Sequence, residues 1–349
     1  HLLSRRQRQM CIRDRYNGNK RLKTIQQEKL NNQVAELDVA TSENNIQESI
    51  AQVYIQILYA AESVKVNEST LQVSIAQRDR GQELLNAGSI AKSDFAQLEA
   101  QVSTDRYQLV TAQATLEDYK LQLKQLLELD GENEMNIYLP ALSDENVLAP
   151  LPTKKDVYIS ALSLRPEIEA SKLNVEASEL GIGIAKSSYL PTISLSAGIG
   201  TNHTSGSDFT FGEQVKNGWN NSIGLSVSVP IFNNRQTKSA VQKAKLQYET
   251  SMLSLLDEQK TLYKTIEGLW LDANSAQQRY AAANEKLKST QISYELISEQ
   301  FNLGMKNTIE LLTEKNNLLQ AQQEQLQAKY MAILNTQLLK FYQGDQLAL

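Results

Sequence analysis

Two long stretches of the chain contain no proline and almost no glycine, and they constrain its fold more than any other feature. Residues 19–85 hold one glycine, Gly81, and residues 233–301 hold one, Gly268. All six prolines of the 349-residue chain lie between residues 140 and 230. At ~1.5 Å per residue, each stretch would make a helix of about 100 Å, whereas ordinary helices average ~11–12 residues. The sequence therefore predicts two very long helices, separated by a middle segment rich in turns.

These two stretches belong to an internal repeat. An ungapped offset of 216 residues aligns Asn86-Ala87-Gly88 with Asn302-Leu303-Gly304. Glycine ends a helix because, lacking a Cβ, it enters the left-handed region without a clash. Each long helix is therefore expected to end there and to be followed by a shorter return helix, near residues 92–128 and 308–342. Chance similarity between two helical arms is the alternative to a duplication.

Both copies carry an apolar seam of the coiled-coil type. Apolar residues follow one another at alternating spacings of four and three, which is the pattern of helices that pack knobs-into-holes. The seam residues are Ile46, Ile50, Val53, Ile57 and Ala60 in the first copy, and Leu262, Ile266, Leu269, Ala273 and Ala276 in the second. The sequence thus predicts a mainly α, internally duplicated protein built from very long antiparallel coiled-coil hairpins.

Between the arms, residues 191–200 and 222–231 alternate strictly between apolar and small polar side chains. Strands of about ten residues with one apolar face are typical of transmembrane β-strands, in which that face contacts lipid. On this interpretation residues 201–218 form an extracellular loop, and the lipid-facing residues are Ile193, Leu195, Ile223, Leu225 and Val227. A soluble amphipathic hairpin that packs on helices is the alternative.

The residue inventory excludes several kinds of chemistry. The only cysteine is Cys11, and the only histidines are His1 and His203. This excludes a Cys/His metal cluster, a disulfide framework and a Cys/His nucleophile pair. The net charge of −5 does not favour nucleic-acid binding, which uses basic stripes. No run of ~18 apolar residues predicts a transmembrane helix. We predict no enzymatic activity, no catalytic or metal site, no cofactor and no nucleic-acid partner.

The first fifteen residues differ from the rest of the chain. They hold five arginines and one aspartate, and regular helical patterning begins just after Tyr16-Asn17. We interpret residues 1–15 as non-native sequence that resembles translated read-through of a sequencing adapter; a natural basic tail is the alternative.

Several motifs together resemble those of the TolC-like outer-membrane efflux factors. Arg165-Pro166-Glu167-Ile168 opens a helix that leads to the strand at Pro191, and Val229-Pro230-Ile231-Phe232-Asn233 leads directly into a long helix. The turns that begin at Gly88 and Gly304, GSIAKSD and GMKNTIE, are also similar. The resemblance covers residues 16–343. It implies a homotrimer in which long helices form an α-barrel across the periplasm and each protomer gives four strands to one transmembrane β-barrel of twelve.

Two strands are visible in this chain, and Tyr16-Asn17-Gly18 matches the end of a strand in the first half of the family pattern. We therefore interpret the chain as an N-terminally truncated fragment that contributes two strands to the barrel. We expect a signal sequence, a helix and two further strands upstream.

The resemblance implies the exit duct of a tripartite efflux or secretion system. Such a duct sits in the outer membrane and its lipid, with its helical part in the periplasm. It docks with a periplasmic adaptor (membrane fusion) protein and an inner-membrane pump of the RND or ABC type, and it conducts substrates passively. The alternative function is a soluble periplasmic coiled-coil adaptor or scaffold protein.

The resemblance also implies two sets of site residues. Adaptor docking falls on the hairpin tips, where glycine lets backbones approach closely: Gly88, Ser89, Gly304 and Met305. The alternative is that each glycine only stops a helix. The gate residues implied by the resemblance are Asp94, Lys306, Phe301 and Glu310. Asp94 would be linked to Lys306, and Glu310 would belong to an acidic ring. Phe301 lies where several relatives have tyrosine. The alternative is that Asp94 and Glu310 only favour the N-termini of their helices.

The expected organisation follows from these assignments. After residues 1–15 come a first-half hairpin (16–129), an extended equatorial crossover (130–166), a helix leading to the barrel (167–188), a β-hairpin with its loop (189–232), a second-half hairpin (233–343) and a tail (344–349). For the crossover, a plain surface linker is the alternative.

Overall fold

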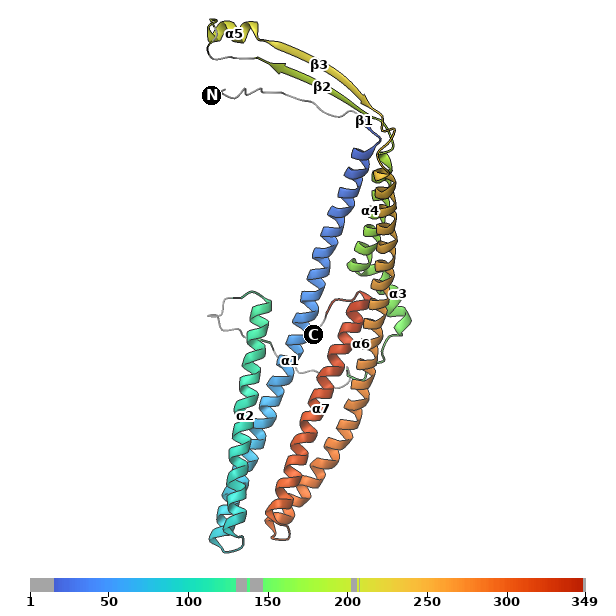
Figure 1. Cartoon of the computed structure of the whole chain (residues 1–349). Coiled ribbons are helices and arrows are strands. Elements are labelled where there is room, and N and C mark those ends of the chain that lie inside the picture. Colours follow the sequence, from blue (N-terminus) through green and yellow to red (C-terminus); the bar gives the residue numbers. More distant parts are fainter. Residues whose placement is uncertain (1–15, 130–136, 139–146, 202–205, 207, 348–349) are drawn as a thin grey trace. The chain divides into compact units, whose positions relative to one another are not determined.

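The computed structural model describes residues 16–129, 137–138, 147–201, 206 and 208–347, and helices dominate it (Figure 1). Residues 1–15, interpreted above as non-native, lie outside the described residues, as do residues 130–136 and 139–146 of the expected crossover. The elements in chain order are β1 (Tyr16–Asn17), α1 (Lys20–Asn86), α2 (Lys92–Leu126), α3 (Lys154–Leu164), α4 (Pro166–Ser187), β2 (Thr192–Gly200), α5 (Phe211–Asn217), β3 (Asn220–Ser228), α6 (Gln236–Asn302) and α7 (Thr308–Gln343).

The repeat predicted from the sequence is visible in the helices. α1 and α6 each contain 67 residues, and both of their ends are separated by the same 216 positions. α2 and α7 begin at the same offset and contain 35 and 36 residues. The prediction of two long helical hairpins is confirmed. The first return helix ends at Leu126, two residues before the expected 128, because Glu128 has a left-handed φ of 51°.

The turn from strand to long helix is also repeated. Two successive residues have positive φ in each copy: Gly18 and Asn19 in the first, Asn234 and Arg235 in the second. At Gly18 a Cβ would lie 2.9 Å from the carbonyl oxygen of Ser187, so only glycine fits. An ordinary side chain in this region costs roughly 1–2 kcal/mol. The second copy therefore tolerates backbone strain that the glycine relieves at one position of the first.

The described chain divides into two compact units. The strand unit comprises residues up to 39 together with 166–259, and the hairpin unit comprises residues 40–165 together with those from 260 onward. Both long helices contribute residues to both units.

The strand unit contains an antiparallel sheet of order β1-β2-β3. The two predicted strands are β2 and β3, and the short β1 lies at Tyr16-Asn17, which the resemblance matched to the end of a first-half strand; Tyr16 pairs with Ile193. Beneath the sheet, α4 packs on the first part of α1. The Gln27 side-chain amide donates to the Ala177 carbonyl at 2.8 Å, and a Cβ at Gly183 would lie 2.7 Å from the Lys23 ammonium.

The second predicted strand is shifted in the structure. It was expected over 222–231, and β3 covers Asn220–Ser228. Pro230 has no N–H to donate to a ladder and restricts the backbone of Val229, so pairing ends before both. The loop expected over 201–218 contains the short helix α5. Its N-terminus is closed by a capping box in which Thr210 and Glu213 satisfy each other's backbone N–H groups.

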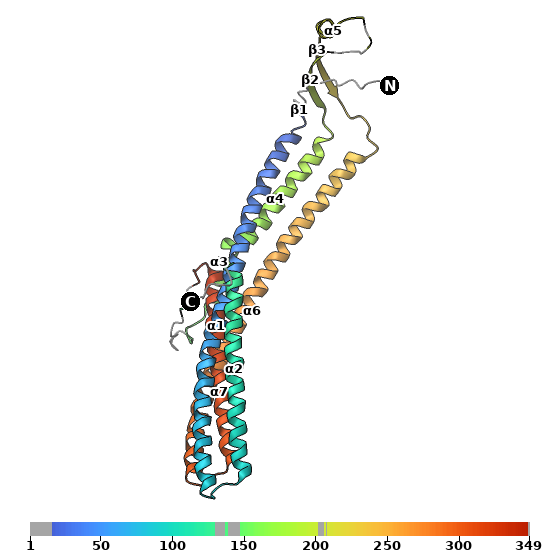
Figure 2. The same cartoon turned by 90° about the vertical axis from the view of Figure 1, so that its left-hand side faces the viewer.

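The hairpin unit contains the main apolar core. In both views α2 runs back beside α1 and α7 beside α6, and the two tips lie at the same end of this unit (Figures 1 and 2). Among the described residues, Tyr280 is the largest side chain that is fully buried. The core residues are Ile55, Leu58, Val147, Ala276, Tyr280, Leu326, Ala328, Tyr330, Ala332, Ile333, Leu334 and Leu338.

The two apolar seams are covered to different extents. Most of the second seam is buried, including Ile266 and Ala273. In the first seam Ile57 is buried, whereas Ile46 is 49% exposed. The return helices contain 35 and 36 residues, so Ile46 and its repeat counterpart Leu262 both lie beyond the stretch that they cover. Leu262 is nevertheless buried, and α3 contacts α6 beside it, through Tyr158 on Tyr263.

The crossover, where the structure describes it, contacts α6 and contains a helix. Its extended part, from Val147 to Pro152, is held by side chains of α6: Gln277 donates to the carbonyls of Val147 and Ala149 at 2.9 and 2.8 Å, and the Trp270 indole donates to Pro152 at 3.0 Å. The crossover then forms α3, a helix that the sequence analysis did not predict. Thr153 caps α3 by accepting from the Asp156 N–H at 3.3 Å.

Candidate functional site

The two hairpin tips have the same backbone geometry. Gly88 and Gly304 are left-handed, with φ of 73° and 75°. In the first tip the Ser89 N–H bonds to the Leu84 carbonyl at 2.8 Å and the Gly88 N–H bonds to Leu85 at 3.0 Å. The second tip repeats both bonds at 2.9 Å, from Met305 and from Gly304. This is a Schellman motif, which satisfies carbonyls at the end of a helix.

Both tip glycines are open to solvent. A Cβ added at either position would meet nothing within 4 Å, so packing inside this chain does not require glycine there. Left-handed geometry does favour it, and so would close approach of another backbone. The second tip is also apolar: Leu303, Met305 and Ile309 are 67%, 64% and 63% exposed. Ser89 in the first tip is exposed as well.

Among the predicted gate residues, Lys306 and Glu310 meet within the chain. The Lys306 Nζ lies 2.6 Å from Glu310 Oε1. Glu310 also forms a capping box with Asn307: its backbone N–H donates to Asn307 Oδ1 at 2.9 Å, and its carboxylate accepts from the Asn307 N–H at 3.2 Å. The bonds from Lys306 and from the Asn307 backbone hold the pKa of Glu310 below its usual value. Asn307 was not predicted from the sequence, although Asn-x-x-Glu before an apolar run is a capping signature.

The other two gate residues lie apart from this pair. Asp94 is half-buried in the first turn of α2, whose N-cap is Ala91, with no side-chain capping bond. Among the described residues of this single chain, the ion-pair partner of Lys306 is Glu310 and not Asp94. Phe301 is buried, with 4% of its surface exposed. The helix-capping alternative therefore has a geometric basis at Glu310 and no side-chain bond at Asp94.

The register of β2 with β3 gathers the apolar side chains on one face. Ile193 lies opposite Val227, Leu195 opposite Leu225, and Ala197 opposite Ile223. Serine, threonine and glycine occupy the alternate pairs, such as Ser194 with Ser226. Because side chains alternate along a strand, each of these two sets lies on its own face of the sheet. On β3 the apolar side chains are bare: Ile223 is 84%, Leu225 70% and Val227 58% exposed.

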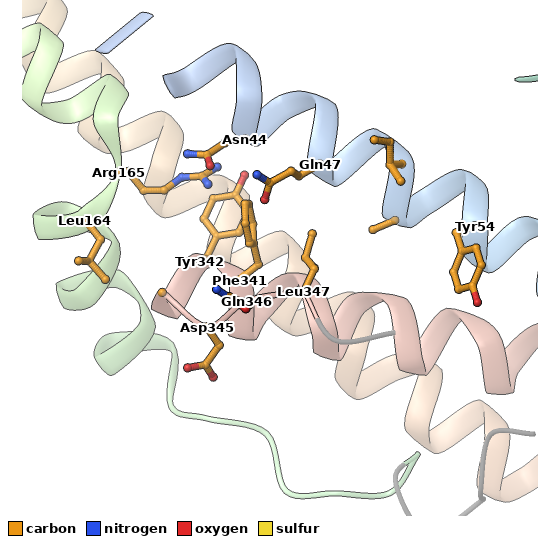
Figure 3. A pocket seen from close by; sticks show the side chains of 13 residues that line it. Asn44, Gln47, Tyr54, Leu164, Arg165, Phe341, Tyr342, Asp345, Gln346 and Leu347 are labelled. Carbon is orange, nitrogen blue, oxygen red and sulfur yellow. The ribbon is translucent and has the colours of Figure 1, made fainter. Parts of the chain in front are cut away.

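A cavity of about 760 Å³ lies in the hairpin unit, lined by α1, the end of α3 and the end of α7 (Figure 3). Arg165 dominates one side of it. Its guanidinium is 2.8 Å from Glu48 and stacks over the Tyr342 ring at 4.0 Å. Glu48 thus balances the charge of Arg165 and the Tyr342 ring covers it, so Arg165 connects the end of α3 to α1 and α7.

Two further observations limit the chemistry of the described residues. No three histidine, cysteine, aspartate or glutamate side chains gather there in a metal-binding arrangement. None of the helices described is apolar enough over a sufficient length to cross a membrane.

Comparison with known proteins agrees with this geometry. Residues 157–344 match the family described as outer membrane efflux protein. The chain is 24% identical over 294 residues to the outer membrane efflux protein BepC of Brucella suis, covering 84% of this chain and 61% of that protein. It is 23% identical over 311 residues to outer membrane protein TolC of Escherichia coli, covering 86% and 62%. The chain thus spans about three fifths of the length of these curated relatives.

The fold is that of solved outer-membrane proteins. The structure of the outer membrane protein VceC from Vibrio cholerae matches with a TM-score of 0.79 and 17% identity, covering 97% of this chain and 80% of that one. The family match covers more than half of the chain and includes α4, the strands β2 and β3, and the whole second hairpin. The chain therefore belongs to the outer membrane efflux protein family: it is a non-enzymatic protein of the outer membrane, and its long helices lie in the periplasm.

Proposed function

We propose that the protein containing this chain is the trimeric exit duct of a tripartite efflux or secretion system. One observation carries the proposal: an apolar sheet face that the chain leaves bare on β3 and only half-buried on most of β2, opposite a face of small polar residues. Fully burying a side chain such as leucine is worth about 1.5–3 kcal/mol. Several such side chains on one face of one hairpin require a cover, and a lipid bilayer around a closed ring of strands supplies it.

The polar face of the same hairpin suits the inside of the duct. Ser194, Ser226 and their neighbours carry neither charge nor bulk, so they leave room for water and solutes. In this proposal Ile193, Leu195, Ile223, Leu225 and Val227 contact lipid, and the duct conducts its substrates passively.

The hairpin tips are the proposed docking surface for a periplasmic adaptor. The support is the pair of solvent-open left-handed glycines, Gly88 and Gly304, with exposed Ser89 and Met305 beside them. We also propose that Asp94, Phe301, Lys306 and Glu310 control the opening at this end. Three-fold symmetry would turn a single Asp94–Lys306 link into three and a single Glu310 into a ring that attracts cations.

The pump is proposed only as an inner-membrane partner of the RND or ABC type. Relatives of this chain include a toxin and drug export protein of Aggregatibacter actinomycetemcomitans and an alkaline protease secretion protein of Pseudomonas aeruginosa. Small-molecule efflux and protein secretion are both within the proposal, since a passive duct takes its substrate range largely from its pump.

Fractionation of the full-length protein tests the proposal. We expect it in the outer membrane, extractable by detergent as a trimer that conducts ions in planar bilayers. Recovery as a soluble periplasmic protein would favour the adaptor or scaffold alternative and contradict the duct.

A further inference from the structure

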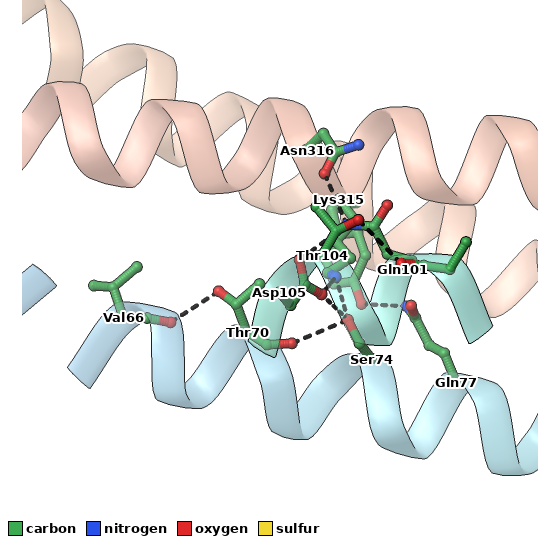
Figure 4. Close-up of polar contacts among 11 residues, drawn as sticks. Val66, Thr70, Ser74, Gln77, Gln101, Thr104, Asp105, Lys315 and Asn316 are labelled. Carbon is green, nitrogen blue, oxygen red and sulfur yellow. Dashed lines mark hydrogen bonds and ion pairs between the residues drawn. The ribbon is translucent and has the colours of Figure 1, made fainter. Parts of the chain in front are cut away.

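A buried ionic network connects three helices of the hairpin unit. Lys315 of α7 contacts both Asp105 of α2 and Ser74 of α1, and Ser74 also donates to Asp105 (Figure 4). Asp105 is 1% exposed, Ser74 2% and Lys315 3%. Gln101 completes the arrangement by donating to the second oxygen of Asp105 at 2.9 Å. The network therefore joins the first hairpin to the return helix of the second.

Burial of this pair is expensive for the fold. Desolvation lowers the pKa of Lys315 below its ordinary value, although the hydrogen bond and charge of Asp105 act in the opposite direction. Buried ion pairs are often no more stabilising than well-packed apolar residues of similar volume. Net stability is therefore a poor explanation for a lysine and an aspartate in the interior of a coiled-coil assembly.

The network also breaks the internal repeat. At the 216-residue offset, Asp105 corresponds to Ala321, which is buried, and Lys315 corresponds to Glu99, which is exposed. Ser74 corresponds to Thr290. If α2 and α7 exchanged places, Glu99 would occupy the position of Lys315 and face no cation. If either slid by one turn, Asp105 and Lys315 would each be buried without a partner.

A duplicated coiled-coil protein needs a feature that distinguishes its two hairpins from each other. α1 and α6 share the same apolar spacing, so their seams alone permit shifted or exchanged pairings of the long helices. A single buried polar group can specify register in a coiled coil at a cost in stability. We propose that the Ser74–Asp105–Lys315 network sets the register and the pairing of the two hairpins, and that it does so without adding to stability.

The decisive variant replaces both charges with apolar residues of similar size, Asp105→Leu with Lys315→Met, in the full-length protein with any native cysteine replaced by serine. Ser74 keeps a partner there, because its hydroxyl can donate its single proton to the Thr70 carbonyl, 3.2 Å away, once Asp105 no longer accepts it. The matched control is Lys286→Met with Glu324→Leu, which removes an ion pair between α6 and α7 whose side chains are both 42% exposed.

Cysteine pairs report the register. Gln77→Cys with Tyr294→Cys tests the native register, because these side chains approach within 2.8 Å across α1 and α6 and neither belongs to the network. Gln77→Cys with Ser298→Cys tests a shift of one helical turn. With both charges present, we expect a short thiol cross-linker to join the native pair at least tenfold more efficiently than the shifted pair.

In the apolar variant we expect the yield of the shifted pair to rise at least threefold, with a thermal midpoint of the trimer equal to or above that of the parent. The control should change neither pattern. If the apolar variant keeps the native pattern, the apolar seams alone set the register and the proposal is wrong. If it melts below the parent or fails to fold, the network contributes stability, and the proposal is equally wrong.

Discussion

A charge placed on the apolar face of β3 should prevent assembly, and the same charge on the opposite face should not. Leu225→Arg and Ser226→Arg are adjacent on one strand and point to opposite faces of the sheet. β3 has nine residues, and Leu225 lies one residue from its centre. At ~3.3 Å per residue and a tilt near 45°, it falls about 2 Å from the middle of the strand. An arginine at that depth against lipid costs ~2–4 kcal/mol, or about 6–12 kcal/mol for three copies in a trimer.

That sum is comparable with the whole stability of a typical folded protein, about 5–15 kcal/mol. We therefore expect Leu225→Arg to abolish the detergent-extracted trimer in the outer membrane, while Ser226→Arg assembles and changes conductance through the lumen. The assay is the amount of trimer on a gel without boiling, together with its thermal midpoint. Equal assembly of the two variants would refute the assignment of the faces.

Three further predictions concern the tips. Gly88→Asn keeps a residue that tolerates left-handed geometry but adds a side chain, so it should leave the thermal midpoint of the trimer unchanged and reduce efflux; loss of folding would mean that this glycine only stops a helix. Lys306→Glu should raise single-channel conductance in planar bilayers. A second substitution in the same chain then identifies the partner of Lys306. Asp94→Lys restores closure if a link to Asp94 holds the gate, and Glu310→Lys restores closure if only the Lys306–Glu310 pair holds it. The pKa of Glu310 is lowered in the folded chain, so the stability that its carboxylate contributes is present above the unfolded pKa and is lost as the pH falls through the lowered pKa. The thermal midpoint of Glu310→Gln should therefore depend less on pH between 6 and 3 than that of the parent.

The long-range architecture was predictable because it depends on features that local sequence shows directly. The absence of proline, one glycine at each tip and strict alternation between Thr192 and Gly200 each specify a backbone state. The short helices α3 and α5 were missed because a single capping residue, Thr153 or Thr210, starts each of them within a segment of irregular composition. Their N-cap patterns could have been recognised, but periodicity cannot reveal helices of two or three turns.

The buried network lay outside the reach of sequence patterns for a different reason. Asp105 and Lys315 are 210 positions apart, and a charge in the middle of a helix usually lies on a solvated face. Only the folded hairpins bring the two side chains together. The one available signal was the repeat itself, which aligns Asp105 with an alanine. That mismatch indicates a buried charge only once the residues packed around Asp105 are known.

The equal length of α1 and α6 restricts how this protein can change in size. The tips sit at the same end of the hairpin unit because both arms contain 67 residues. Seven residues inserted into one arm alone would displace its tip by ~10.5 Å relative to the other, although the four-three spacing would survive. A variant whose hairpins are longer must therefore lengthen both arms and both return helices together. The length of the helical part can then change only in steps of whole heptads, made in both halves at once.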